Sequence, residues 1–180
     1  GYVKKAKKQK VRLAIVRLSN AVSLESIKDE EGIDKTYYTY TISADLDKVG
    51  IDENDNVEID STEKINRVKN LLDTIRWLHL DVKGEKRVLE PLFVIGGVYD
   101  FEDAIFHDIL GMEDNEVDIE KIKDVLGNVP YENAEKDTHC GLMNGIFRNN
   151  DEIVKELDAK SISEYFELIE DKVADYYKNS

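Results

Sequence analysis

The chain has 180 residues, of which 41% are apolar and 36% are charged, and its formal net charge is −14. This length fits one domain, and the composition excludes collagen-like and wholly disordered proteins. No apolar stretch approaches the roughly 18 residues of a membrane span, and nothing suggests a secretory leader. The single cysteine, Cys140, excludes an internal disulfide and is compatible with a reducing compartment. We therefore expect a cytoplasmic protein without a membrane partner.

Basic residues are concentrated at the start of the chain. Residues 1–24 contain seven basic residues and no acidic residue, whereas residues 25–180 carry a charge of −21. The seven are Lys4, Lys5, Lys7, Lys8, Lys10, Arg12 and Arg17. Such a segment can contact phosphates locally while the acidic body repels bulk nucleic acid. The alternative interpretation is a solubilising terminus.

The first half of the chain predicts three strands and one helix. Residues 11–24 and 37–46 alternate in the manner of strands, with the polar residues 28–35 as a loop between them. Residues 61–82 predict an amphipathic helix that begins at a capping box of Asp60 and Glu63 and ends before Gly84. Residues 92–99 are almost continuously apolar and predict a buried strand.

The second half predicts helices. A short helix is expected over residues 118–126, followed by a long irregular segment over 127–150. Ser161 and Glu164 form a second predicted capping box, ahead of an amphipathic helix with apolar residues in phase from Ile162 to Tyr176. The order of elements predicts an α+β fold with helices on one face of the sheet, as in part of a ferredoxin-like sheet.

Motifs for metal binding or catalysis are weak. The acidic loop from Asp52 to Glu63 copies most of an EF-hand spacing, but Val57 stands where the turn needs glycine. His139 and Cys140 are adjacent, which is neither a zinc ligand set nor a geometry for nucleophilic catalysis. The acidic residues lie in loops and on helix faces rather than in a two-metal cluster. We therefore expect no cofactor, no metal and no catalytic residue.

The basic segment is followed by residues that suit RNA. Ser19, Asn20 and Ser23 offer hydrogen bonds to phosphate or to a 2′-hydroxyl, and Tyr37 could stack on a base. Gly96 and Gly97 follow a predicted buried strand and would let the backbone approach a phosphate, although close packing is the commoner reason for such glycines. The motif of ordinary RNA-recognition domains is absent.

Five segments in order resemble one protein family. They are GY at the start, VRLAIVRLSNAVSLES, YYTYTISADLDKVG, KINRVKNLLDTIRWLHLDVKG and LEPLFVIGGVYDFEDAIFHD. They are similar to the DevR family of CRISPR-associated proteins, the repeated backbone subunit of type I Cascade effector complexes, and most of all to the type I-B branch. The resemblance covers about residues 1–110.

The resemblance implies a modified RRM palm with a ferredoxin-like fold, incomplete at its N-terminus because relatives carry a strand and a helix before GY. Residues 1–110 would form the palm core, and residues 111–180 a helical and irregular part of the same domain. Residues 17–23 correspond to the family's stretch near the guide RNA, although Asn20 stands where many relatives carry proline. Gly96 and Gly97 fall on a glycine pair beside the RNA path. Residues 101–105 depart from the family pattern.

The function implied is that of a non-catalytic scaffold in antiviral defence. Copies of the chain would line up along one CRISPR guide RNA with other Cascade subunits, leaving the bases free to pair with target DNA. Two alternatives stay open. One is an endoribonuclease of ferredoxin-like fold that processes guide precursors, which would need a general base near the RNA. The other is a protein-interaction fragment without an RNA role.

Overall fold

The computed structural model describes residues 3–4, 10–11, 14–28, 34–82, 84–101, 103–107 and 109–179. Helices and strands alternate within this part of the chain, which confirms the α+β class. The helices are α1 (Ser61–Arg76), α2 (Ile119–Asn128), α3 (Ala134–Asp137), α4 (Asn150–Leu157), α5 (Ile162–Asn179) and the 3-10 turn η1 (Leu46–Lys48). The strands are β1 (Val3–Lys4), β2 (Lys10–Val11), β3 (Val16–Leu18), β4 (Val22–Lys28), β5 (Asp34–Thr39), β6 (Ile42–Ala44), β7 (Ile51–Asp52), β8 (Val57–Glu58), β9 (His79–Val82), β10 (Glu85–Val88), β11 (Phe93–Gly97), β12 (Met112–Glu113), β13 (Glu116–Val117), β14 (Thr138–Leu142) and β15 (Lys160–Ser161).

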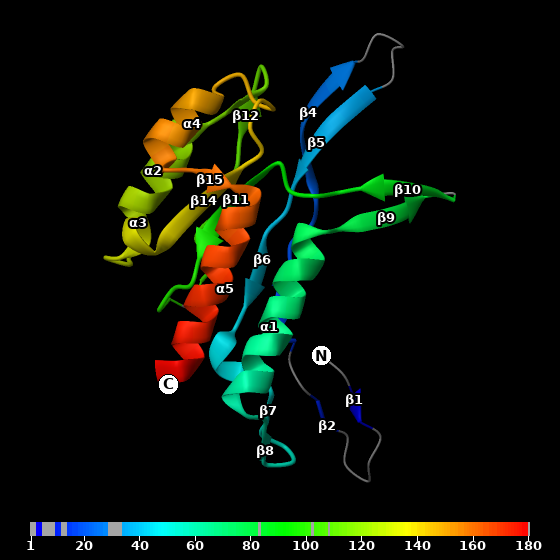
Figure 1. The fold of residues 1–180 in the computed structure, drawn as a ribbon, viewed down its shortest axis with the longest axis vertical. Helices are drawn as coiled ribbons and strands as arrows, with labels where there is room; N and C mark the ends of the chain where they lie inside the picture. The colour runs from blue at the N-terminus through cyan, green and yellow to red at the C-terminus, as the bar shows by residue number, and fades with distance from the viewer. Residues whose placement is uncertain are drawn as a thin grey trace.

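A three-stranded sheet with the order β11–β14–β15 forms the middle layer of the molecule (Figure 1). β11 pairs antiparallel with β14, and β14 pairs parallel with β15. Alternate residues of a strand point to opposite faces, so each face carries its own core. On one face Cys140 packs with Ile122 of α2 and Ile153 of α4. On the other face Val94 packs with Phe166 of α5 and Val68 of α1.

This arrangement corrects the predicted placement of the helices. The sequence predicts helices on one face, but in the described part of the chain α5 and α1 lie on one side of the three-stranded sheet and α2 and α4 on the other. The strand predicted over 92–99 is confirmed as β11. It does not pair with the two preceding predicted strands, which form ladders of their own.

The predicted strand over residues 11–24 is broken into three pieces. β2 pairs with β1, β3 pairs antiparallel with β6, and β4 pairs antiparallel with β5. The predicted strand over 37–46 is likewise divided into β5 and β6. The chain bends between β3 and β4, where the Ser19 hydroxyl accepts a hydrogen bond from the Thr41 amide at 2.9 Å. Two short ladders therefore replace one long pair of strands.

Helix α1 begins as predicted and ends early. The Asp60 carboxylate accepts a hydrogen bond from the Glu63 amide at 2.9 Å, which satisfies one of the free N–H groups of the first turn. The helix ends at Arg76, and residues 79–82 are strand β9 rather than helix. β9 pairs antiparallel with β10. The turn between them places Gly84 at φ +83°, and the Gly84 amide donates to the Asp81 carboxylate.

The predicted irregular segment over 127–150 contains the central strand of the sheet. It includes α3 and β14, and helix α4 begins at its last residue. The prediction of an irregular segment is therefore wrong. The C-terminal helix is confirmed as α5, where the Glu164 carboxylate accepts hydrogen bonds from both the Ser161 amide and its hydroxyl. α5 packs beside α1 (Figure 1).

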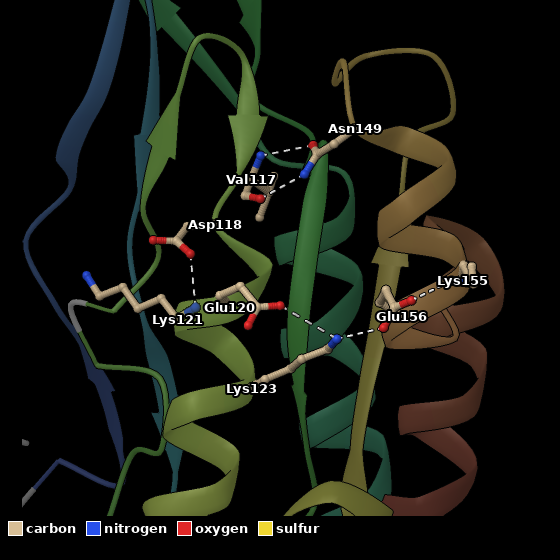
Figure 2. Close-up of polar contacts among 8 residues, drawn as sticks. All are labelled: Val117, Asp118, Glu120, Lys121, Lys123, Asn149, Lys155 and Glu156. Atoms are coloured by element: carbon tan, nitrogen blue, oxygen red, sulfur yellow. Dashed lines mark hydrogen bonds and ion pairs between the residues drawn. The ribbon is translucent and has the colours of Figure 1, made fainter.

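Polar side chains tie α2 and α4 together (Figure 2). The Asn149 amide group bonds both backbone groups of Val117, accepting from its N–H at 3.1 Å and donating to its carbonyl at 2.8 Å. Lys123 of α2 donates to Glu156 of α4 at 2.6 Å, and Lys155 donates to the same carboxylate at 2.8 Å. These two hydrogen bonds lower the pKa of Glu156 to about 2. The two helices are thus joined by a charged cluster, and Ile122 and Ile153 of the same helices belong to one apolar core.

None of the helices in the described part of the chain has the combined length and apolarity that a membrane span requires.

Candidate nucleic-acid interface

The predicted RNA-binding residues fall in three parts of the structure. The register of the β1–β2 ladder pairs Lys4 with Lys10, and for these two residues only the backbone is described. Lys5, Lys7, Lys8 and Arg12 lie outside the described residues. Arg17 is in β3, Ser19 and Asn20 follow it, and Ser23 is in β4. The two glycines are the last residues of β11.

Arg17 projects from an exposed strand and carries an internal counter-ion. Its Nη2 atom lies 3.0 Å from Asp45 Oδ2, and 59% of the Arg17 side chain is exposed. Lys48 Nζ lies 3.2 Å from the same oxygen. The hydrogen bond to Asp45 is the main reason that the pKa of Lys48 is raised above its ordinary value. Two cations therefore share the Asp45 carboxylate, and Asp47, which also acts on Lys48, brings the charge of this group of four residues to zero.

Ser19 is engaged in local structure. Its hydroxyl accepts from the Thr41 amide and donates to the Asn20 carbonyl at 3.0 Å, while its own amide donates to the Thr41 carbonyl at 2.9 Å. These bonds close the end of the β3–β6 ladder. Asn20 is exposed at the bend that follows. Of this pair, the Asn20 side chain is therefore the better placed to contact a ligand.

Ser23 and Tyr37 also have partners within the chain. The Ser23 and Thr36 hydroxyls form a hydrogen bond of 2.6 Å across β4 and β5. The Tyr37 ring packs against Phe147, with 6.0 Å between ring centroids, so it supports the body of the protein rather than presenting a free face for stacking. The exposed aromatic side chain of this strand is Tyr38, which is 61% exposed.

The glycine pair is explained by packing. Gly96 and Gly97 pair with His139 and Thr138 in the central sheet. A Cβ atom on Gly97 would overlap the carbonyl oxygen of Asp137, and one on Gly96 would lie 3.2 Å from the Tyr165 hydroxyl. Both positions therefore need the small residue to let β11 approach its neighbours. The structure places this pair in a different sheet from Arg17 and Ser23.

His139 and Cys140 do not form a reactive pair. They are successive residues of β14, so their side chains point to opposite faces of the sheet. Burial raises the pKa of the Cys140 thiol to about 12, so the thiol is neutral at pH 7. The pKa of His139 is lowered, first by burial and then by the nearby Lys172. A neutral, 2% exposed thiol is unsuited to act as a nucleophile.

The acidic loop that resembles a calcium loop forms a hairpin. β7 and β8 pair antiparallel around a turn in which Asn56 has φ 54° and Asp52 accepts from the Asn54 and Asp55 amides. Asp60 caps α1. Within the described ranges, no three His, Cys, Asp or Glu residues are grouped closely enough to hold a metal ion.

Sequence reasoning missed two candidate residues at the end of α1. Trp77, the single tryptophan of the chain, is 56% exposed, and the Arg76 guanidinium lies over its ring at 4.9 Å from the centroid. The prediction of a helix to residue 82 placed both inside that helix and gave no reason to single them out. The available signal was the pair itself, because an arginine beside a lone tryptophan is a frequent element of interfaces.

Comparisons of this chain with family models, with curated proteins and with solved structures give no match. The functional argument therefore depends on the residues and on the geometry described above.

Proposed function

We propose that this chain is a guide-RNA-binding scaffold subunit of a type I CRISPR effector complex, a member of the DevR family of the type I-B branch, acting in the cytoplasm. The observation that carries the proposal is the separation of charge along the chain: +7 over residues 1–24 and −21 over the remainder. A cationic segment on an anionic body binds a polyanion locally and in a fixed orientation.

The exposed Arg17 supports the same interpretation. It extends the basic segment onto β3, and its carboxylate partner is shared with Lys48, so Asp45 does not hold Arg17 alone. Asn20 lies beside it at an exposed bend. Contacts of this kind read the backbone of RNA rather than its bases, which suits a subunit that leaves the bases free.

The fold that we propose for residues 1–110 is a modified RRM palm. Its strands would include β3, β6 and β11, with α1 packed behind them, and the packing of both Ile15 and Val94 against one buried cluster supports this arrangement. A complete ferredoxin-like sheet would pair these strands directly. In the structure, β3–β6 and β11–β14–β15 are separate sheets.

The proposed role is structural rather than catalytic. Copies of the chain bind side by side along one guide RNA, together with other subunits, and target DNA is bound through the guide. Binding by adjacent copies is expected to be cooperative along the strand. Nothing in this role requires a cofactor or a nucleophile.

A mobility-shift titration with single-stranded RNA at two salt concentrations tests the proposal. Replacing Lys4, Lys5, Lys7 and Lys8 by alanine should weaken binding with little sequence preference. It should also flatten the plot of log affinity against log salt by about 0.7 per lost contact. The matched control replaces four exposed lysines of the acidic body, Lys121, Lys136, Lys155 and Lys178, and should leave the slope unchanged. Equal effects of the two variants would refute the assignment of the site.

A further inference from the structure

The end of α1 presents an aromatic ring and a guanidinium as one unit. Trp77 is the residue after α1, its ring is 56% exposed, and the Arg76 guanidinium carbon lies 4.9 Å from the ring centroid. Arg76 Nη2 also donates to the Ser163 hydroxyl of α5 at 2.8 Å. A guanidinium has five N–H donors, so this bond orients Arg76 while most of its donors are available to a ligand.

A cavity opens beside this unit. It has a volume of about 600 Å³ and lies between the end of β14, α4 and the first turn of α5. Ser163, the partner of Arg76, is one of its lining residues. The lining of the cavity is mixed. Leu142, Met143, Val154, Ala159 and Ile162 are apolar, and Asn144, Asn150, Asp151, Lys160, Ser161 and Ser163 are polar or charged. Pockets with apolar walls and polar groups that fix orientation are the usual form of a small-molecule site.

We propose that Trp77 stacks on one unpaired base of the bound RNA while Arg76 contacts the phosphate of that nucleotide, with the neighbouring nucleotide in the cavity beside Ser163. This inference rests on the proposed function, because the ligand is the RNA. Proteins bind unpaired bases by stacking them on aromatic rings and on guanidinium planes, and here the guanidinium carbon lies 4.9 Å from the ring centroid.

The geometry favours RNA over a generic anion. A phosphate alone would need Arg76 and would leave the exposed ring in water. An exposed ring gains from a flat partner that stacks on it, and a base with its attached phosphate satisfies both groups at once.

The chain offers a direct readout, because Trp77 is its only tryptophan. Oligouridylate is titrated into the wild-type protein while tryptophan emission and the mobility shift are recorded on the same samples. We expect emission to be quenched in parallel with the fraction of RNA bound. Polyphosphate, which carries the charge without bases, should leave the emission nearly unchanged. Equal quenching by polyphosphate would overturn the stacking contact.

Variants supply the second measurement. Trp77→Ala should weaken RNA binding by about 5- to 150-fold, the range measured for loss of one stacked base, and Trp77→Phe should recover part of that loss. Val57→Ala removes an exposed apolar side chain at the opposite end of α1 and should bind as the wild type does. RNA binding with unchanged emission and an unaffected Trp77→Ala variant would overturn this inference and leave the proposed function standing. Absence of any RNA shift at low salt would instead overturn the proposed function.

Discussion

Arg17 and Asp45 form an ion pair across the β3–β6 ladder, with 3.0 Å between the guanidinium Nη2 and the carboxylate Oδ2. Arg17 is largely exposed, whereas the Asp45 side chain is only 18% exposed. The mostly buried carboxylate therefore fixes the position of a guanidinium that is itself largely exposed to solvent. An internal carboxylate in this position competes with phosphate for Arg17, and this competition leads to a prediction.

Replacing Asp45 by asparagine should strengthen RNA binding. The change frees both Arg17 and Lys48, and an exposed ion pair of this kind corresponds to a gain of about 1.5- to 5-fold in affinity. Arg17→Ala should lower affinity and reduce the salt slope by about 0.7. Asp47→Asn, which removes one charge from an exposed neighbour, is the control in the same mobility-shift titration. An Asp45→Asn effect no larger than that of Asp47→Asn would contradict a role for Arg17.

Gly97→Ala should destabilise the fold by about 1–3 kcal/mol, as overpacking of a tight site does. The added methyl group would overlap the Asp137 carbonyl oxygen, which belongs to the backbone and has little room to move. The free energy of unfolding, measured by urea titration, reports the effect.

Gly127→Ala is the matched control. Gly127 is within α2, and no atom lies within 4 Å of the Cβ that alanine would add. Alanine in a helix is more favourable than glycine by about 0.5–1 kcal/mol, so this variant should be slightly more stable than the wild type. If Gly97→Ala were as stable as Gly127→Ala, packing would not explain the glycine pair.

The Glu156 carboxyl group should titrate far below its ordinary pKa of 4.5. Hydrogen bonds from Lys123 and then Lys155 lower its pKa to about 2 in the folded protein. A lowered pKa means that the charged form stabilises the fold above pH 4.5 and that this contribution is lost as the pH falls towards 2. NMR titration of the side-chain carboxyl carbon measures the value directly, and Lys123→Ala should raise it. Titration near 4.5 in the wild type would show that the cluster in Figure 2 does not persist in solution.

The scaffold should not cleave guide-precursor RNA. The alternative function, an endoribonuclease, needs a general base. His79 is a candidate because it is exposed on β9 rather than inside a helix, and its Nδ1 lies 3.1 Å from the Trp77 carbonyl oxygen. Incubation of the protein with repeat RNA in the absence of metal should give no cleavage. Specific cleavage that His79→Ala abolishes would establish the nuclease and exclude the scaffold.

The parts of the fold that sequence predicts well are those with a strong local signal. Ser161 and Glu164 make both hydrogen bonds of the predicted capping box, whereas Asp60 accepts from the Glu63 amide but Glu63 pairs with Arg67 instead of returning a bond. The apolar run over residues 92–99 is strand β11 as predicted. The end of α1 was misplaced because Leu78 continues the helical stripe. The turn that closes the hairpin, from Asp81 to Gly84, is the signal that marks the following residues as strands.

The sequence pattern does not predict the central strand β14. It has five residues, includes Gly141 and is surrounded by Gly and Pro, which is the composition of a loop. In the structure, a Cβ on Gly141 would meet both Tyr165 of α5 and Val94 of β11, so the glycine is there because the packing is tight. Tertiary contacts decided the conformation, and a single sequence does not reveal them. The same holds for Ser19 and Ser23, whose hydroxyls suit RNA in composition but bond to Thr41 and Thr36 in the fold.

Guide-RNA binding is tested most directly by isolating the protein from cells in which it is made with its natural RNA and measuring what is bound. We expect short RNAs of uniform length that co-purify with the wild-type chain and are lost when Lys4, Lys5, Lys7 and Lys8 are replaced by alanine. Protein free of RNA, or RNA of random length retained equally by the alanine variant, would contradict guide-RNA binding.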